Sequence, residues 1–121
     1  MDAARRGLAR TVSLIEPSDE IEADHRAAVL EWIGSGAPLY RTRPPDEPDR
    51  HLVSYFVPYD AASGALMMVA HRKAGLDLPP GGHCEPGESP WTTVARECVE
   101  ELGVAAVPVP WAGTAVGSEN P

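Results

Sequence analysis

Residues 82–104 read GHCEPGESPWTTVARECVEELGV, and this stretch is the most informative part of the sequence for the fold. Ser89 is a suitable helix N-cap, Pro90 suits the first helical position, and Gly103 can end the helix as its C′ residue. The stretch therefore predicts a Gly- and Pro-rich loop followed by a helix over residues 90–102, which is roughly three and a half turns.

The predicted helix has two different faces. Glu97, Glu100 and Glu101 stand at i, i+3 and i+4, which places three carboxylates on one patch. Like charges at this spacing destabilise a helix by about 0.2–0.5 kcal/mol per pair, and Arg96 offsets only part of that repulsion. The patch is either a solvated acidic surface or a site for a hard divalent cation such as Mg²⁺ or Mn²⁺. The opposite side should pack on a core and consists of Trp91, Val94, Ala95, Cys98 and Leu102.

The spacing of the polar residues across the whole stretch is more specific than the helix alone. It resembles the Nudix box of the Nudix (MutT-like) hydrolases, with Cys98 and Val104 at its two apolar positions. Upstream, the run Leu78-Pro79-Pro80-Gly81 also resembles the family's entry into the loop. The seven fixed positions of the box are filled by Gly82, Glu88, Arg96, Glu97, Glu100, Glu101 and Gly103.

This resemblance implies an enzyme, a pyrophosphohydrolase that splits a nucleoside diphosphate linked to another moiety X with the help of Mg²⁺ or Mn²⁺. Glu97 and Glu101 are the expected metal ligands. Glu100 is a third ligand or a partner of the ligands, and it is also our candidate for the general base, which in the family can instead come from a later loop. The alternative is a non-catalytic nucleotide-binding or sensor domain with the same fold.

The resemblance also assigns supporting roles within the box. Arg96 and Glu88 are expected to hold the loop against the helix and orient the glutamates. Gly81 and Gly82 are expected to let the backbone approach the metal and the phosphates closely, and a carbonyl of this pair can itself be a ligand.

The implied fold is an α/β/α sandwich on a mixed sheet. We expect residues 1–17 to be an N-terminal arm and residues 18–121 to be the Nudix domain. Because only residues 105–121 follow the box, we expect the C-terminal part of the domain to be missing, and the open sheet edges to favour a homodimer.

Composition restricts the partners. Eighteen acidic and ten basic residues give a formal net charge of −8, which argues against a nucleic-acid polymer. A small phosphorylated substrate remains possible if metal ions bring positive charge into the site, and the family resemblance implies that this substrate is a nucleotide. No apolar run is long enough for a signal peptide or a membrane span, so we expect a cytoplasmic protein. Cys84 and Cys98 make a weak disulfide case, and the pair His83-Cys84 lacks the second half of a zinc site. Arg72, Lys73 and His83 either touch phosphate or are solvated surface.

The remaining elements are predicted from local pattern. Residues 1–10 should be frayed, and residues 12–15 form a short strand or an ordered arm. Asp19 and Glu22 are spaced like a capping box before a helix over 20–33, and residues 37–50 form a loop. Strands over 51–57 and 65–71 should pair as a hairpin, and residues 106–111 form at most an edge strand. The predicted apolar side of the first helix contains Ile21, His25, Ala28, Val29, Trp32 and Ile33.

Overall fold

The computed structural model describes residues 1–41 and 50–109. Within these ranges the chain forms two compact units, which are described in turn. One unit contains the residues before Leu52 together with residues 108–109, and the other contains Leu52–Val107. Most of the predicted loop over 37–50 and the end of the predicted edge strand lie outside the described residues, and residues 106–109 are not part of a strand.

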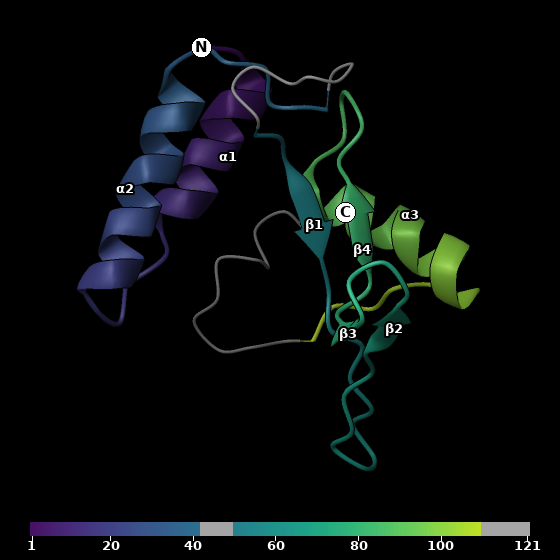
Figure 1. Ribbon diagram of the computed structural model, residues 1–121. Coiled ribbons are helices and arrows are strands. Elements are labelled where there is room, and N and C mark those ends of the chain that lie inside the picture. The colour runs from purple at the N-terminus through teal and green to yellow at the C-terminus, as the bar shows by residue number, and fades with distance from the viewer. Residues whose placement is uncertain (42–49, 110–121) are drawn as a thin grey trace. The chain divides into compact units, whose positions relative to one another are not determined.

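The first unit is built on two helices, α1 (Ala3–Ser13) and α2 (Glu20–Gly34), which lie side by side (Figure 1). The prediction that the chain starts with a frayed segment is wrong, and so is the prediction of a strand or arm over residues 12–15. Asp2 caps α1, because its carboxylate accepts a hydrogen bond of 2.8 Å from the Arg5 N–H. The Arg5 side chain then donates to the carbonyl oxygens of Ile33, at 2.8 Å, and of Ala37. These bonds tie the basic segment to the end of α2.

The start of α2 is as predicted, but the orientation of its apolar side is not. Asp19 accepts from the Glu22 N–H at 2.8 Å, and the Glu22 carboxylate accepts from the Ser18 N–H at 2.7 Å. This second bond, with a smaller contribution from His25, lowers the pKa of Glu22. Within the predicted apolar set, Ile33 is buried and Trp32 half-buried, whereas Ile21, His25, Ala28 and Val29 are exposed.

The inward side of α2 is set by contacts that periodicity does not reveal. Arg26 donates to the Ile15 carbonyl at 2.8 Å, so this charged residue is on the more buried side of the helix. The better-buried positions recur at helical spacing as Ala23, Arg26, Leu30 and Ile33.

The second unit contains two antiparallel strand pairs and the helix of the box. Strand β1 (Val53–Tyr55) pairs with β4 (Gly81–His83), and β2 (Val69–His71) pairs with β3 (Leu76–Leu78) (Figure 1). The α/β class and the Nudix-type fold are confirmed. In detail, the strands of the described ranges are three residues long and form two-stranded antiparallel sheets where a mixed sheet was expected.

The predicted hairpin between residues 51–57 and 65–71 is wrong in its pairing. The first strand instead pairs with the glycine segment, and the Phe56 N–H donates to the Pro80 carbonyl at 2.9 Å. Beyond the end of the predicted first strand, Tyr59 forms an isolated antiparallel bridge with Leu66. Pro58 lacks an N–H, so it interrupts the ladder between these two parts.

Helix α3 (Pro90–Leu102) contacts both β1 and β4. Its Cys98 is buried, as are Ser54 on β1 and Cys84 just after β4, where the Ser54 hydroxyl and the Cys84 thiol lie 3.3 Å apart. Both cysteines are free thiols, so the two do not form a disulfide. Small polar and sulfur-containing side chains therefore fill the space between the helix and the strand pair.

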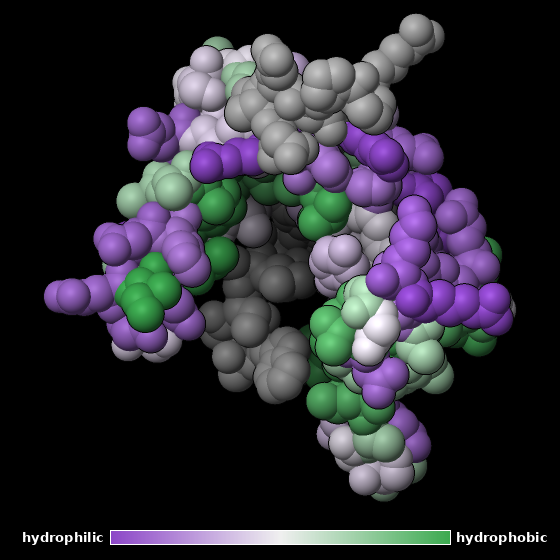
Figure 2. All heavy atoms as spheres, viewed as in Figure 1, coloured by the Kyte–Doolittle hydropathy of each residue, from purple (hydrophilic) through white to green (hydrophobic). Residues whose placement is uncertain are grey.

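Apolar side chains also contribute to the surface, where they alternate with hydrophilic ones on the face shown in Figure 2. In the second unit the exposed ones lie on and beside the turn after β1, where Leu66 is 63 % exposed, and also on and after α3, where Val107 is 82 % exposed. Within the described ranges, no helix has both the length and the apolar character needed to cross a membrane.

Candidate active site

The local signals in residues 82–104 place the helix as predicted. The Ser89 hydroxyl accepts the Thr92 N–H at 3.1 Å, and Pro90 occupies the first turn. Gly103 has φ of 71°, a left-handed conformation that favours glycine, and its N–H donates to the Val99 carbonyl at 2.9 Å. The predicted packing side is buried at Cys98 and half-buried at Trp91, Val94, Ala95 and Leu102.

The loop is attached to the helix by a pair of parallel bonds between Arg96 and Glu88. Arg96 Nε donates to Glu88 Oε2 at 2.7 Å, and Arg96 Nη2 donates to Glu88 Oε1 at 3.0 Å. The Glu88 side chain is only 12 % exposed. Glu88 Oε1 also accepts the Glu85 N–H at 2.7 Å and the Thr93 hydroxyl at 3.1 Å. The Arg96 hydrogen bonds are the main cause that lowers the pKa of Glu88 to about 2, and they also raise the pKa of Arg96.

The same guanidinium reaches toward the acidic patch of the helix. Arg96 Nη1 donates to Glu97 Oε1 at 2.9 Å and to Glu100 Oε2 at 3.3 Å. Arg96 Nη2 also donates to the His83 carbonyl at 3.1 Å, at the end of β4. One side chain therefore connects the loop, the strand and two glutamates.

The glycine pair brings the backbone against the glutamates. A Cβ on Gly82 would lie 2.7 Å from the Glu97 Cδ and closer still to Oε1, so a larger residue at this position would displace the carboxylate. A Cβ on Gly81 would lie 2.7 Å from the Tyr55 Cα and closer to the Ser54 carbonyl on the neighbouring strand. The Gly81 backbone also acts to lower the pKa of Glu101, so β4 lies near both predicted metal ligands.

Glu97 and Glu101 lie close enough to influence each other. Partial desolvation, and then the negative charge of Glu97, raise the pKa of Glu101, whereas the hydrogen bond from Gly81 opposes that rise. The Glu97 side chain is 13 % exposed. Two neighbouring carboxylates that repel each other beside a glycine backbone match the donor chemistry of a hard divalent cation.

Glu100 is more exposed than Glu97. Its side chain is 58 % exposed and points to Arg96. Across the described part of the chain, no three Asp, Glu, His or Cys side chains converge as a group that could hold a metal ion. The predicted group of three glutamate ligands is therefore not assembled as one cluster in the described residues.

Among the other predicted residues, Arg72 and Lys73 are exposed in the turn between β2 and β3, and His83 contributes its backbone carbonyl to the network. Sequence reasoning missed Thr93, which is fully buried and contacts Glu88. The available signal was its position four residues after Ser89, because a hydroxyl one turn into a helix can reach back toward the capping loop.

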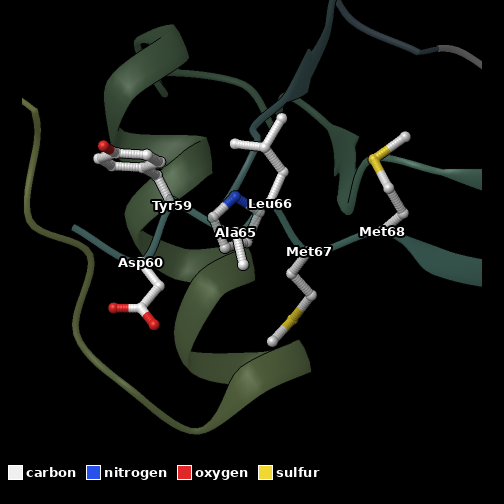
Figure 3. Close-up of a pocket in the computed structure, with 7 residues that line it drawn as sticks. Tyr59, Asp60, Ala65, Leu66, Met67 and Met68 are labelled. Atoms are coloured by element: carbon white, nitrogen blue, oxygen red, sulfur yellow. The ribbon is translucent and has the colours of Figure 1, made fainter. Parts of the chain in front are cut away.

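A cavity of about 510 Å³ lies beside the turn after β1 and is not part of this site. It is lined by Pro58–Asp60 and Ala65–Met68, and its labelled side chains diverge from one another (Figure 3). Hydrogen bonds from the Ser63 side chain and the Ala62 backbone lower the pKa of Asp60, so this carboxylate serves the turn.

The fold and the site together define an α/β domain. In it the loop before α3 is attached to α3 by the bonds between Glu88 and Arg96, and Arg96 also bonds to the His83 carbonyl of β4. A family model described as the NUDIX domain matches residues 49–117, which is more than half of the chain. The chain therefore belongs to the Nudix family, and the resemblance drawn from the sequence is confirmed. No curated protein and no solved structure matches the chain.

Membership carries general properties. Nudix domains hydrolyse derivatives of nucleoside diphosphates at pyrophosphate bonds, act on small phosphorylated, nucleotide-like substrates, and generally use divalent metal ions such as Mg²⁺.

Proposed function

We propose that this protein hydrolyses a nucleoside diphosphate linked to a further moiety X, with Mg²⁺ or Mn²⁺ bound by Glu97 and Glu101. The observation that carries the proposal is the close approach of the Glu97 carboxylate to Gly82, with Glu101 near enough to Glu97 that, after partial desolvation, the charge of Glu97 raises the pKa of Glu101. This arrangement supports a site that binds a cation and a phosphate group at one place.

A divalent cation bound there would neutralise phosphate charge and lower the pKa of a bound water. The chain's own residues supply the positioning. Glu88 fixes Arg96, Arg96 fixes one oxygen of Glu97, and Gly82 leaves room for that carboxylate to lie against the strand. Reactions at a diphosphate depend mainly on charge stabilisation and on alignment of the attacking water, so such positioning is a large part of catalysis.

We further propose Glu100 as the general base that takes a proton from the attacking water. The exposure of its side chain supports this role, because 58 % of it is accessible to solvent and hence to a water molecule. A residue whose carboxylate stays outside the pair formed by Glu97 and Glu101 can accept a proton without leaving a cation.

The test is a substrate panel. The protein is incubated with Mg²⁺ or Mn²⁺ and with nucleoside triphosphates, dinucleoside polyphosphates and nucleotide sugars, and the released phosphate, pyrophosphate and nucleotide are measured. We expect turnover of at least one member with the cation and none with a chelator. Binding without turnover across the panel would instead support the non-catalytic nucleotide-binding domain.

A further inference from the structure

Thr93 has no role among the proposed metal ligands or in the bonds between Arg96 and Glu88, yet its side chain lies beside them. Thr93 is fully buried, on the side of α3 that faces the loop. Its hydroxyl donates to Glu88 Oε1 at 3.1 Å and also lies 3.3 Å from the Ser89 carbonyl. The hydroxyl therefore has two acceptors, one of them the carboxylate that binds Arg96.

The contacts continue from Thr93 to the proposed metal ligands without a break. Glu88 Oε1 accepts both the Thr93 hydroxyl and Arg96 Nη2, so Thr93 restricts the rotation of the carboxylate that Arg96 grips. Arg96 Nη1 then holds Glu97 Oε1 at 2.9 Å. Each link is a hydrogen bond of 3.1 Å or less with at least one partly buried partner.

We propose that Thr93 is a positioning residue, whose hydroxyl fixes Glu88 so that Arg96 and Glu97 keep the geometry in which Glu97 binds the cation. This inference rests on the proposed function, because it assigns Thr93 to the same metal site. Groups that orient metal ligands from outside typically change metal affinity about 10- to 100-fold when they are lost.

A buried threonine can also serve packing alone, and the two roles make opposite predictions. Thr93→Val keeps the shape of the side chain and removes the hydroxyl, whereas Thr93→Ser keeps the hydroxyl and removes a methyl group. If packing matters, serine is the more damaging change, and if the hydroxyl positions Glu88, valine is.

The experiment measures Mn²⁺ affinity by the electron paramagnetic resonance signal of the free ion, for the full chain and for three variants, after circular dichroism has shown that each is folded. Thr92→Val is the matched control, since Thr92 is the exposed neighbour on the same helical turn. Its hydroxyl contacts the Ser89 hydroxyl and not Glu88. We expect Thr93→Val to weaken Mn²⁺ binding about 10-fold. Thr93→Ser and Thr92→Val should stay within about threefold of the native protein, a difference worth under about 0.7 kcal/mol.

The inference is overturned if Thr93→Val binds Mn²⁺ like the native protein, or if Thr93→Ser is the weaker binder. Those results leave the proposed function intact as long as Glu101→Gln still loses binding. If the native protein itself binds no Mn²⁺, the proposed metal site is wrong, and the role of Thr93 at that site is overturned with it.

Discussion

Replacement of Glu88 by glutamine tests how the loop is held against α3. The ionised carboxylate accepts two bonds from Arg96, one from the Glu85 N–H and one from Thr93, and its side chain is only 12 % exposed. The pKa of Glu88 is about 2 in the folded protein, against 4.5 for an unperturbed glutamate. Each pH unit between these values is worth about 1.4 kcal/mol, so the ionised form contributes about 3 kcal/mol to the free energy of unfolding.

The sign follows from linkage. Because the folded pKa lies below the unfolded pKa, the contribution is complete above about pH 4.5 and is lost as the pH falls toward about 2. A glutamine keeps the shape but lacks the charge. We therefore expect Glu88→Gln to lower the free energy of unfolding by about 2–3 kcal/mol at pH 7. The difference in stability between the native protein and the variant should mostly disappear at about pH 2.

The assay is urea unfolding monitored by circular dichroism at pH 7, 4.5, 3 and 2. Asp77→Asn is the control, since it changes the net charge equally at an exposed position on β3. Equal stability of Glu88→Gln and the native protein at pH 7 would refute this reasoning, as would a difference that does not shrink with acidification.

Three further changes test the neighbouring parts of the site. Gly82→Ala should abolish most metal-dependent hydrolysis, because the added Cβ meets the Glu97 carboxylate, whereas Gly34→Ala, which has open space around its Cβ, should retain the native rate; comparable initial rates for the two variants would contradict the close contact. Glu100→Gln should lower kcat about 100-fold or more with little change in Mn²⁺ affinity, as expected for a general base, and a parallel loss of Mn²⁺ binding would identify Glu100 as a ligand instead. In metal-free protein the raised pKa of Glu101 adds folding stability that is lost as the pH rises above about 4.5. Mg²⁺ at about 100 times its Kd should then raise the free energy of unfolding by about 2.7 kcal/mol. Thermal melts with and without Mg²⁺ measure this, and a Glu101→Gln protein that gains as much from Mg²⁺ would rule out the assignment.

Where a structural feature follows from local chemistry, the sequence was enough to predict it. The boundaries of α3 depend on a serine cap, a proline in the first turn and a left-handed glycine, each of which acts within a few residues. The same applies to the cap at the start of α2. The pairing of Arg96 with Glu88 spans only eight residues and was accessible through the spacing of the family motif.

Features that depend on distant parts of the chain were not predictable in the same way. The apolar periodicity of α2 suggested a buried side that includes Ile21 and Val29, but arginine–carbonyl bonds from Arg5 and Arg26 accompany a different orientation. Similarly, β1 matched the pattern of a hairpin strand, yet the glycine segment near residue 81 is its partner, because glycines allow two backbones to approach closely. The bonds from one arginine to both Glu97 and Glu100 depend on the reach of that side chain, which helical spacing does not specify.

The central claim is that Glu97 and Glu101 hold the cation that hydrolysis requires. The most direct test is kcat/KM for the best substrate of the panel as a function of Mg²⁺ concentration, in the native protein and in Glu101→Gln. We predict a saturable Mg²⁺ dependence in the native protein and a loss of at least about 100-fold in the variant, which corresponds to about 2.7 kcal/mol of transition-state stabilisation. Equal kcat/KM values in the two proteins at every Mg²⁺ concentration would contradict the assignment.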